Sequence, residues 1–163
     1  MSFSLLTLDA LPSIEVFYAQ YWNKRPFLVR GAIKQTVIDR LIQPDELASL
    51  SMEETAQARM VSRKDWTCKL GPFTKDDFNT AGMPPWSLLV QDVEKFHPDT
   101  GTLLREFNFA PRWLMDDIMA SFSTEGGTIG GHIDSDNLLR VPVKWKRGRG
   151  RYYHPWWPRR GGN

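Results

Sequence analysis

Two residues late in the chain have the types and spacing that suit metal chemistry. His132 and Asp134 are separated by one residue, and on a β-strand alternate side chains project from the same face. An imidazole and a carboxylate placed in this way supply two of the three ligands of a 2-His-1-carboxylate triad, which holds Fe(II) and leaves positions open for other ligands. His132 and Asp134 are therefore candidate metal ligands, but the pair by itself is more typical of a surface or capping role.

The other histidines and the nearby glycines bear on this prediction. His97 lies in a His-Pro-Asp sequence that favours a solvated turn, and His154 lies in the basic end of the chain, so neither is predicted as the third ligand. The pairs Gly126-Gly127 and Gly130-Gly131 allow tight turns and close backbone approach just before His132. No residue is singled out as a catalytic acid, base or nucleophile, and no other cofactor-binding residue is predicted.

The helices and strands that could position the pair are predicted from the spacing of apolar residues and from the residues that start or end such segments. Apolar residues recur at helical spacing over residues 11–23, with Asp9 or Ser13 as the cap. A second helix is expected over 44–52, where proline and two acidic residues open the first turn. A further helix is expected near 100–107, followed by a segment over 112–119 that is not assigned to helix or strand. Strands are expected at 27–30, 58–62, 66–70, 86–93, 121–123 and 128–134.

Composition limits the class of protein. The chain has 163 residues with 41% hydrophobic and 12% aromatic side chains, which is enough for one domain with an apolar core. Trp86, Leu88 and Val90 are predicted core residues. The single cysteine, Cys68, excludes an internal disulfide framework and is expected to be a small, partly buried apolar residue. The chain has no long apolar run and no signal-peptide pattern, so we expect no membrane association and a cytoplasmic protein.

The charge distribution changes abruptly near residue 136. All 19 acidic residues precede that point, whereas eight of the 21 basic residues follow it in a stretch rich in Arg, Gly, Pro and Trp. We expect this basic tail, residues 137–163, to be an accident of coding that is non-native or disordered. The alternative is a selected RNA-binding tail, since arginine with aromatic residues can pair phosphate contacts with base stacking.

Several separated sequence blocks resemble one family. They occur in the order 22–27 (WNKRPF), 43–48 (QPDELA), 86–91 (WSLLVQ) and 121–134 (SFSTEGGTIGGHID). In this order they resemble the bacterial JmjC-type ribosomal oxygenases, cupin-like proteins that hydroxylate an arginine of a large-subunit ribosomal protein. The resemblance covers roughly residues 10–136, which is far more of the chain than the metal pair alone.

The resemblance implies a fold, a site and a reaction. It implies an α+β fold in which N-terminal helices and strands, residues 1–108, lead into the first strands of a double-stranded β-helix, residues 109–136. His132 and Asp134 would be the first two Fe(II) ligands. The co-substrate would be 2-oxoglutarate, whose oxidative decarboxylation drives the hydroxylation, and the partner would be a ribosomal protein of the large subunit.

The sequence also departs from the family pattern. Gly131 stands where the family usually has proline, and the similarity fades soon after Asp134. The later iron-binding histidine and most of the barrel have no counterpart, so we expect a truncated barrel that is inactive by itself and prone to self-association through exposed sheet edges. Two alternatives stay open, namely a non-catalytic protein-interaction fragment and a ribosome- or RNA-binding protein that uses the basic tail.

Overall fold

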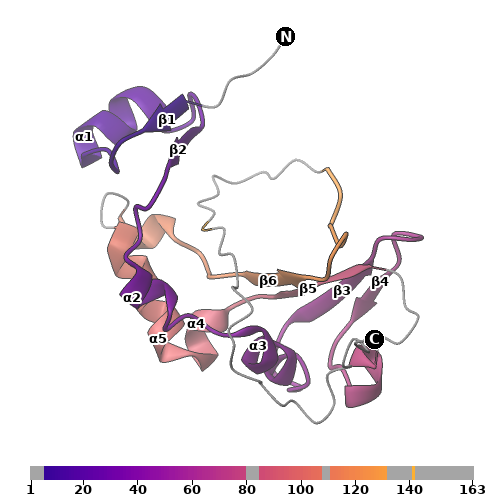
Figure 1. The fold of residues 1–163 in the computed structure, drawn as a ribbon. Coiled ribbons are helices and arrows are strands. Elements are labelled where there is room, and N and C mark those ends of the chain that lie inside the picture. The colour runs from indigo at the N-terminus through magenta and orange to yellow at the C-terminus, as the bar shows by residue number, and fades with distance from the viewer. Residues whose placement is uncertain (1–5, 80–84, 108–110, 132–140, 142–163) are drawn as a thin grey trace, which may run out of the picture.

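The computed structural model describes residues 6–79, 85–107, 111–131 and 141. These residues form two parts, a small N-terminal unit and a larger four-stranded sheet with short helices packed on it (Figure 1). In Figure 1 the N-terminal unit lies above the helices at one end of the sheet. The mixture of helix and antiparallel sheet agrees with the predicted α+β class.

The N-terminal unit pairs two short strands across a helical crossover. Strand β1 (Leu6–Leu8) runs parallel to β2 (Phe27–Val29), with Leu6 opposite Phe27. Between them lie α1 (Ile14–Val16) and a π-helical turn (Phe17–Tyr21). Ser13 caps α1 as predicted, because its hydroxyl accepts a hydrogen bond from the Val16 amide at 3.3 Å. The predicted helix is therefore present, but its second half is wider than an α-helix.

Aromatic side chains hold the N-terminal unit together. Phe17 and Tyr21 are its buried centre, and Phe17 contacts Trp22 and Phe27 edge to face at centroid distances of 5.6 and 6.5 Å. After the π-helical turn, the ammonium group of Lys24 donates hydrogen bonds to the carbonyls of Tyr18 and Ala19 at 3.3 and 2.6 Å. A cation at this end of a helix satisfies free carbonyls and opposes the helix dipole.

Two helices connect this unit to the sheet. They are α2 (Gln35–Ile38) and α3 (Pro44–Leu50). Helix α3 begins where the sequence predicts it, with a capping box in which the Glu46 carboxylate accepts a hydrogen bond from the Gln43 amide at 2.8 Å. Leu47 and Ala48 on its inner face are buried beneath the sheet.

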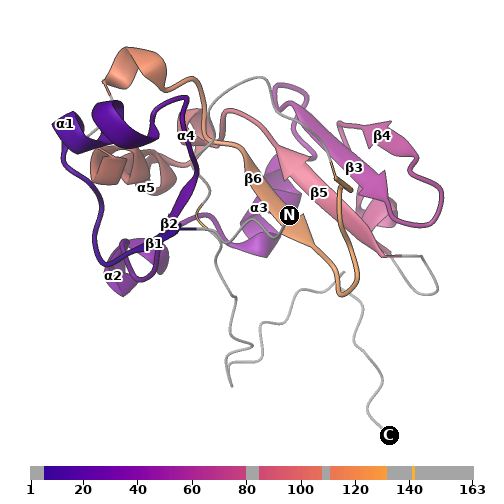
Figure 2. The same ribbon diagram turned by 90° about the horizontal axis from the view of Figure 1, so that it is seen from above.

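The four-stranded sheet is antiparallel throughout, with strand order β4-β3-β5-β6. Its strands are β3 (Ala58–Ser62), β4 (Cys68–Leu70), β5 (Trp86–Val90) and β6 (Ala120–Ser123). Figure 2 shows the four strands side by side with α3 against one face. Strand β5 is buried along its whole length because it lies between β3 and β6.

Short helical segments surround the sheet. A 3-10 helix (Lys75–Phe78) follows β4, while α4 (Val93–Phe96), α5 (Pro98–Gly101) and two 3-10 helices (Thr102–Phe107 and Arg112–Leu114) connect β5 to β6. The predicted strand 86–93 ends at Val90, because Asp92 adopts a left-handed conformation with φ of 56° and α4 begins after it.

The core lies between the α3 face of the sheet and the segments that cover it. Phe78, Leu88, Val90 and Val93 are at most 1% exposed, and Trp86 is 2% exposed. The predicted core residues are therefore confirmed. Cys68 was predicted to be partly buried and is exposed, because β4 is an edge strand of the sheet formed by the described residues. No helix in the described ranges is long and apolar enough to cross a membrane.

Candidate metal-binding region

The predicted ligands His132 and Asp134 lie outside the described residues, so the structure shows the segment that leads to them. This approach segment, residues 124–131, follows β6 directly. Its shape depends on contacts with two other parts of the chain, the start of β5 and the tip of the β3–β4 hairpin.

Hydrogen bonds fasten the end of β6 to the start of β5. The hydroxyl groups of Ser87 and Ser123 are 2.7 Å apart. The Thr124 amide donates to the Trp86 carbonyl at 3.0 Å, and the Trp86 amide donates to the Thr124 hydroxyl oxygen at 3.0 Å. The Thr124 hydroxyl lies 3.1 Å from the same carbonyl. The approach segment therefore starts from a fixed point on the central strand.

Gly127 passes so close to β5 that no side chain fits there. A Cβ at this position would lie 2.3 Å from the Trp86 carbonyl oxygen and 3.0 Å from the Thr124 carbonyl oxygen. Its amide donates to the Thr124 carbonyl at 2.8 Å, and Gly126 before it has a φ of +78°. This is the tight turn and close backbone approach that the glycine pair indicates in the sequence.

The approach segment then turns again at Gly130. This residue has a φ of +80°, and its amide donates to the Thr128 hydroxyl oxygen at 3.1 Å. A Cβ on Gly130 would lie 3.0 Å from the indole ring of Trp66. The predicted strand 128–134 is therefore wrong for residues 128–131, because the positive φ of Gly130 and its hydrogen bond to the Thr128 side chain replace the extended conformation.

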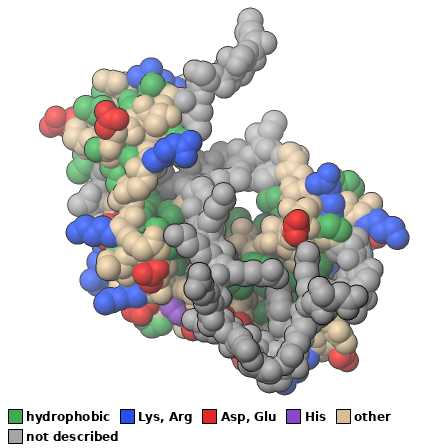
Figure 3. Space-filling model, viewed as in Figure 1, with side chains coloured by type: hydrophobic (Ala, Val, Ile, Leu, Met, Phe, Trp, Pro, Cys, Tyr) green, Lys and Arg blue, Asp and Glu red, His purple; other side chains and the backbone are tan. Residues whose placement is uncertain are grey.

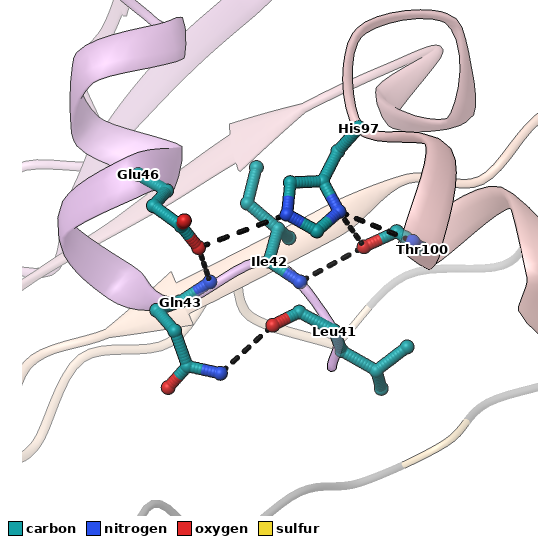
Figure 4. A network of polar contacts seen from close by, with 6 residues as sticks. All are labelled: Leu41, Ile42, Gln43, Glu46, His97 and Thr100. Carbon is teal, nitrogen blue, oxygen red and sulfur yellow. Dashed lines mark hydrogen bonds and ion pairs between the residues drawn. The ribbon is translucent and has the colours of Figure 1, made fainter. Parts of the chain in front are cut away.

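His97 has a structural role that the sequence did not indicate. Figure 4 shows its ring between α3 and α5, where Nδ1 accepts a hydrogen bond from the Thr100 amide at 3.1 Å and lies 2.9 Å from the Thr100 hydroxyl. That hydroxyl oxygen accepts from the Ile42 amide at 2.8 Å. The ring Nε2 is 3.8 Å from the Glu46 carboxylate. The predicted solvated turn is wrong, since His97 caps α5 and its side chain is only 23% exposed.

This network accounts for His97 without any metal. Its Nδ1 already accepts a backbone hydrogen bond, so that nitrogen is not free to bind an ion. Within the described ranges, no group of three or more His, Cys, Asp or Glu side chains could hold a metal ion. A site built from three or more such side chains would therefore have to include residues outside the described ranges.

Comparisons with known proteins bear directly on the resemblance seen in the sequence. The chain is 40% identical over 133 residues to the ribosomal protein uL16 3-hydroxylase of Escherichia coli strain K12, a match that covers 80% of this chain. It is 34% identical over 131 residues to a probable ribosomal oxygenase of Haemophilus influenzae, which covers 78% of this chain. The chain is a relative of the ribosomal oxygenases. No protein-family profile matches the sequence.

Solved structures of a ribosomal oxygenase share the fold of this chain. The Escherichia coli ribosomal oxygenase YcfD matches 74% of the chain at 41% identity with a TM-score of 0.65. YcfD has also been solved with cobalt and succinic acid, and with cobalt and 2-oxoglutarate. The chain spans about a third of the length of the ribosomal oxygenases that it matches, and this coverage fits the predicted likeness to their N-terminal portion.

Proposed function

We propose that this chain carries the first part of an Fe(II)- and 2-oxoglutarate-dependent oxygenase that hydroxylates an arginine of a large-subunit ribosomal protein. The observation that carries the proposal is the 40% identity to a uL16 3-hydroxylase across a segment that includes the sheet. The existence of YcfD structures with cobalt and 2-oxoglutarate supports the choice of metal and co-substrate.

The proposed iron ligands are His132 and Asp134. Their donor types fit Fe(II). The hydrogen bonds between Thr124 and Trp86, together with the turns at Gly126-Gly127 and Gly130, define the path of the backbone before them. When bound, the iron would supply the oxidation of 2-oxoglutarate by dioxygen and the hydroxylation of the substrate. The protein itself would contribute the two ligands, which follow directly after the approach segment in the sequence.

The ligand count limits what the chain does by itself. Only three histidines are present in the sequence, and His97 is engaged in capping α5. His154, in the basic tail, lies outside the described residues. We therefore propose that the chain binds a divalent metal weakly through two protein ligands and does not turn over 2-oxoglutarate without a further ligand.

Metal titration tests the ligand assignment. Calorimetric titration of the 163-residue chain with Mn(II) should show weak binding that is lost when His132 and Asp134 are both replaced by alanine. His154→Ala is the matched control and should leave the affinity unchanged. Tight binding that survives the double replacement would refute the assignment, and a loss with His154→Ala would make that residue the third ligand.

Succinate release tests the limit on turnover. The chain is incubated with Fe(II), ascorbate, 2-oxoglutarate and a peptide of the large-subunit ribosomal protein, beside the Escherichia coli enzyme as the positive control. We expect no succinate from this chain above the protein-free background. Robust succinate formation would contradict the two-ligand proposal.

A non-catalytic role in protein association has one specific observation in its favour. The edge strand β4 is exposed at all three residues, and Leu70 on it is 70% exposed. An exposed edge can pair with another strand. We propose self-association through this edge, which predicts that Leu70→Lys lowers the apparent mass in sizing experiments. The domain division at residues 108 and 136 and the RNA-binding alternative for residues 137–163 remain predictions. Both boundary residues, and all of the tail except residue 141, lie outside the described ranges.

A further inference from the structure

Trp66 stands at the tip of the β3–β4 hairpin in a conformation that bulky residues rarely adopt. Its φ is +59°, in the left-handed region that costs a large side chain conformational energy. Gly130 approaches the six-membered ring at one side, yet the residue stays 53% exposed, so burial does not offset that cost. Strained residues that are not explained by packing cluster where proteins bind ligands, which makes the hairpin tip a candidate binding surface.

The turn is held by hydrogen bonds that do not involve the indole. The Trp66 amide donates to the Ser62 carbonyl at 3.1 Å, and the Ser62 amide donates to the Thr67 carbonyl at 2.9 Å. The Asp65 carboxylate accepts from the Thr67 hydroxyl at 2.8 Å and from the Thr67 amide at 3.2 Å. The indole is therefore presented to solvent from a backbone that is fixed without it.

Two exposed cations lie beside the indole. Arg63 and Lys64 are the first two residues after β3, and neither takes part in an ion pair within the part of the chain that the structure describes. The Arg63 amide donates to the Pro85 carbonyl at 2.7 Å, which fixes the backbone from which both side chains project. Figure 3 shows Lys and Arg side chains at the right-hand edge of the molecule, where Figure 1 places this hairpin.

The acidic groups near these cations are already engaged. Asp65 accepts its hydrogen bonds within the turn, and Asp77 forms an ion pair with Lys69 on β4. From the start of β3 to the end of β4 the sequence has four basic residues and one acidic residue. The hairpin is therefore positively charged, and the charges of Arg63 and Lys64 are available to an anionic partner.

The position of the guanidinium leaves room for such a partner at the ring. The Arg63 guanidinium lies 5.8 Å from the centre of the Trp66 ring, within the range of a cation–π contact. This distance exceeds the roughly 4 Å between atoms in van der Waals contact. A flat group can therefore take the place next to the indole while the exposed Arg63 side chain turns toward a neighbouring anion.

An exposed indole flanked by two cations fits one class of partner better than others. Lysine and arginine neutralise phosphate groups, and an aromatic ring stacks on an unpaired base. The bases of a duplex are stacked on one another, so a ring that stacks on a base suits a single strand. An acidic peptide would use the two cations but would give the indole no flat partner.

We propose that the tip of the β3–β4 hairpin binds single-stranded nucleic acid. Trp66 stacks on one base, while Arg63 and Lys64 contact the phosphates on either side of it. The proposal is independent of metal binding and uses described residues only. It also differs from RNA binding by the basic tail, because the tail contains neither the indole nor the two cations. One ring and two cations predict weak binding with little preference for sequence.

Binding of labelled oligonucleotides tests the stacking contact. Fluorescence anisotropy of uridine and thymidine oligomers of about 12 nucleotides is measured with the 163-residue chain, within the site sizes of single-strand binders. Trp66→Ala should weaken binding about 5-fold or more, and Trp66→Phe should restore part of the loss. Trp113→Ala is the matched control, because Trp113 is 81% exposed in a separate 3-10 helix. A preference for one oligomer supports the proposal and identifies RNA or DNA as the partner.

Salt dependence tests the two cations separately from the ring. Replacing Arg63 and Lys64 together by alanine should reduce the slope of log affinity against log salt by about 1.4, since each phosphate contact to a single strand contributes about 0.7. Trp66→Ala should leave this slope unchanged, because stacking releases no counterions. Replacing the exposed Lys34 and Arg40 by alanine is the matched control and should change neither slope nor affinity.

The eight basic residues of the tail are present in every variant, so the comparison isolates the hairpin. An affinity unaffected by Trp66→Ala, or a slope unaffected by the loss of Arg63 and Lys64, overturns the proposal and leaves binding to other surfaces. Polyglutamate that binds as tightly as the oligonucleotides, with the same loss in Trp66→Ala, would assign the tip to acidic peptides and overturn it too. Circular dichroism spectra of all variants should match, because the hydrogen bonds of the turn use none of the replaced side chains.

Discussion

The sheet and the N-terminal unit are held together in different ways. In the described part of the chain, the sheet has twelve buried core residues, whereas the N-terminal unit has two, Phe17 and Tyr21. The aromatic side chains around these two are only partly buried and meet edge to face. The sheet therefore depends on the area of apolar surface that it buries, and the N-terminal unit depends on ring geometry around a small centre.

The partners of the two regions also differ. The sheet core is closed by α3 and by the 3-10 helix that contains Phe78. The N-terminal cluster instead packs against Phe107 and Met115, which belong to the connection between β5 and β6. We infer that the N-terminal unit can open without disturbing the sheet, so that the approach segment depends on the sheet alone.

The largest expected effect comes from the centre of the sheet core. Phe78 is fully buried and contacts Phe73 and Trp86 at centroid distances of 5.8 and 5.9 Å. Phe78→Ala should lower the free energy of unfolding by about 3–5 kcal/mol, because it leaves a cavity that rigid strands cannot fill. Urea denaturation measures this. Phe96→Ala is the control, since Phe96 is 40% exposed, and an equal loss there would contradict the assignment of the core.

Phe17→Ala should cost less and act locally. We expect a loss of about 2 kcal/mol, because the partly exposed rings around Phe17 can move into the space. Hydrogen exchange should show faster exchange over residues 6–29 with β5 still protected. Ile14→Ala, at a residue 53% exposed on the same crossover, should change neither quantity. Equal loss of protection in β5 would show that the two regions unfold as one.

The hydroxyl group of Thr100 gives a smaller expected effect. It is the acceptor for the Ile42 amide at 2.8 Å, and Thr100 is 3% exposed. Thr100→Val keeps the shape and removes that acceptor, so we expect a loss of about 1–2 kcal/mol in thermal or urea unfolding. Thr102→Val is the matched control, because the Thr102 hydroxyl donates to the Asp99 carbonyl at an exposed position. Similar losses for both would mean that burial does not decide the effect.

Asp77 gives the smallest effect and a pH dependence. Burial alone would raise the pKa of Asp77, but hydrogen bonds from Lys69 and from the Thr74 amide and hydroxyl outweigh it and lower the pKa below the ordinary 3.8. A carboxyl group with a lowered pKa stabilises the fold above its unfolded pKa and loses this effect as the pH falls through its folded pKa.

Melting temperatures of Asp77→Asn and the unmodified chain measure this effect. The variant should melt at a slightly lower temperature at pH 7, and the difference should shrink as the pH falls below about 3.8. Asp76→Asn, at the exposed neighbouring carboxylate, should show no such convergence. A difference that grows toward acid pH would show that the sign of the Asp77 contribution is wrong.

The fold was predictable from sequence where one strong local signal decides it. Helix α3 starts at Pro44 as expected, and β3 and β5 start at the predicted residues. Tertiary contacts decide the rest. Strand β1 was not predicted, because it is stabilised by parallel pairing with β2, whose residues lie twenty-one positions later in the chain. The exposure of Cys68 depends on its place at the edge of the sheet, which periodicity does not reveal.

Around the proposed ligands, too, some features could be predicted from the local sequence and others depend on tertiary contacts. The glycines before His132 indicate turns and close approach, and the structure has both at Gly127. The contact between Trp66 and Gly130 joins segments more than sixty residues apart, so nothing in the local sequence could indicate it. His97 is a similar case, since its partners Glu46 and Thr100 meet it only after α3 and α5 have packed.

The strand order of the sheet has a consequence for how quickly its parts form. Strands β3 and β4 join through a short hairpin, but β6 reaches β5 only after the helical connection between them has been closed. Closing a short loop is faster and costs less chain entropy than closing a long one. We expect the β3–β4 hairpin, with Trp66 at its tip, to form early and β6 to dock last. The approach segment would then meet a hairpin that is already in place.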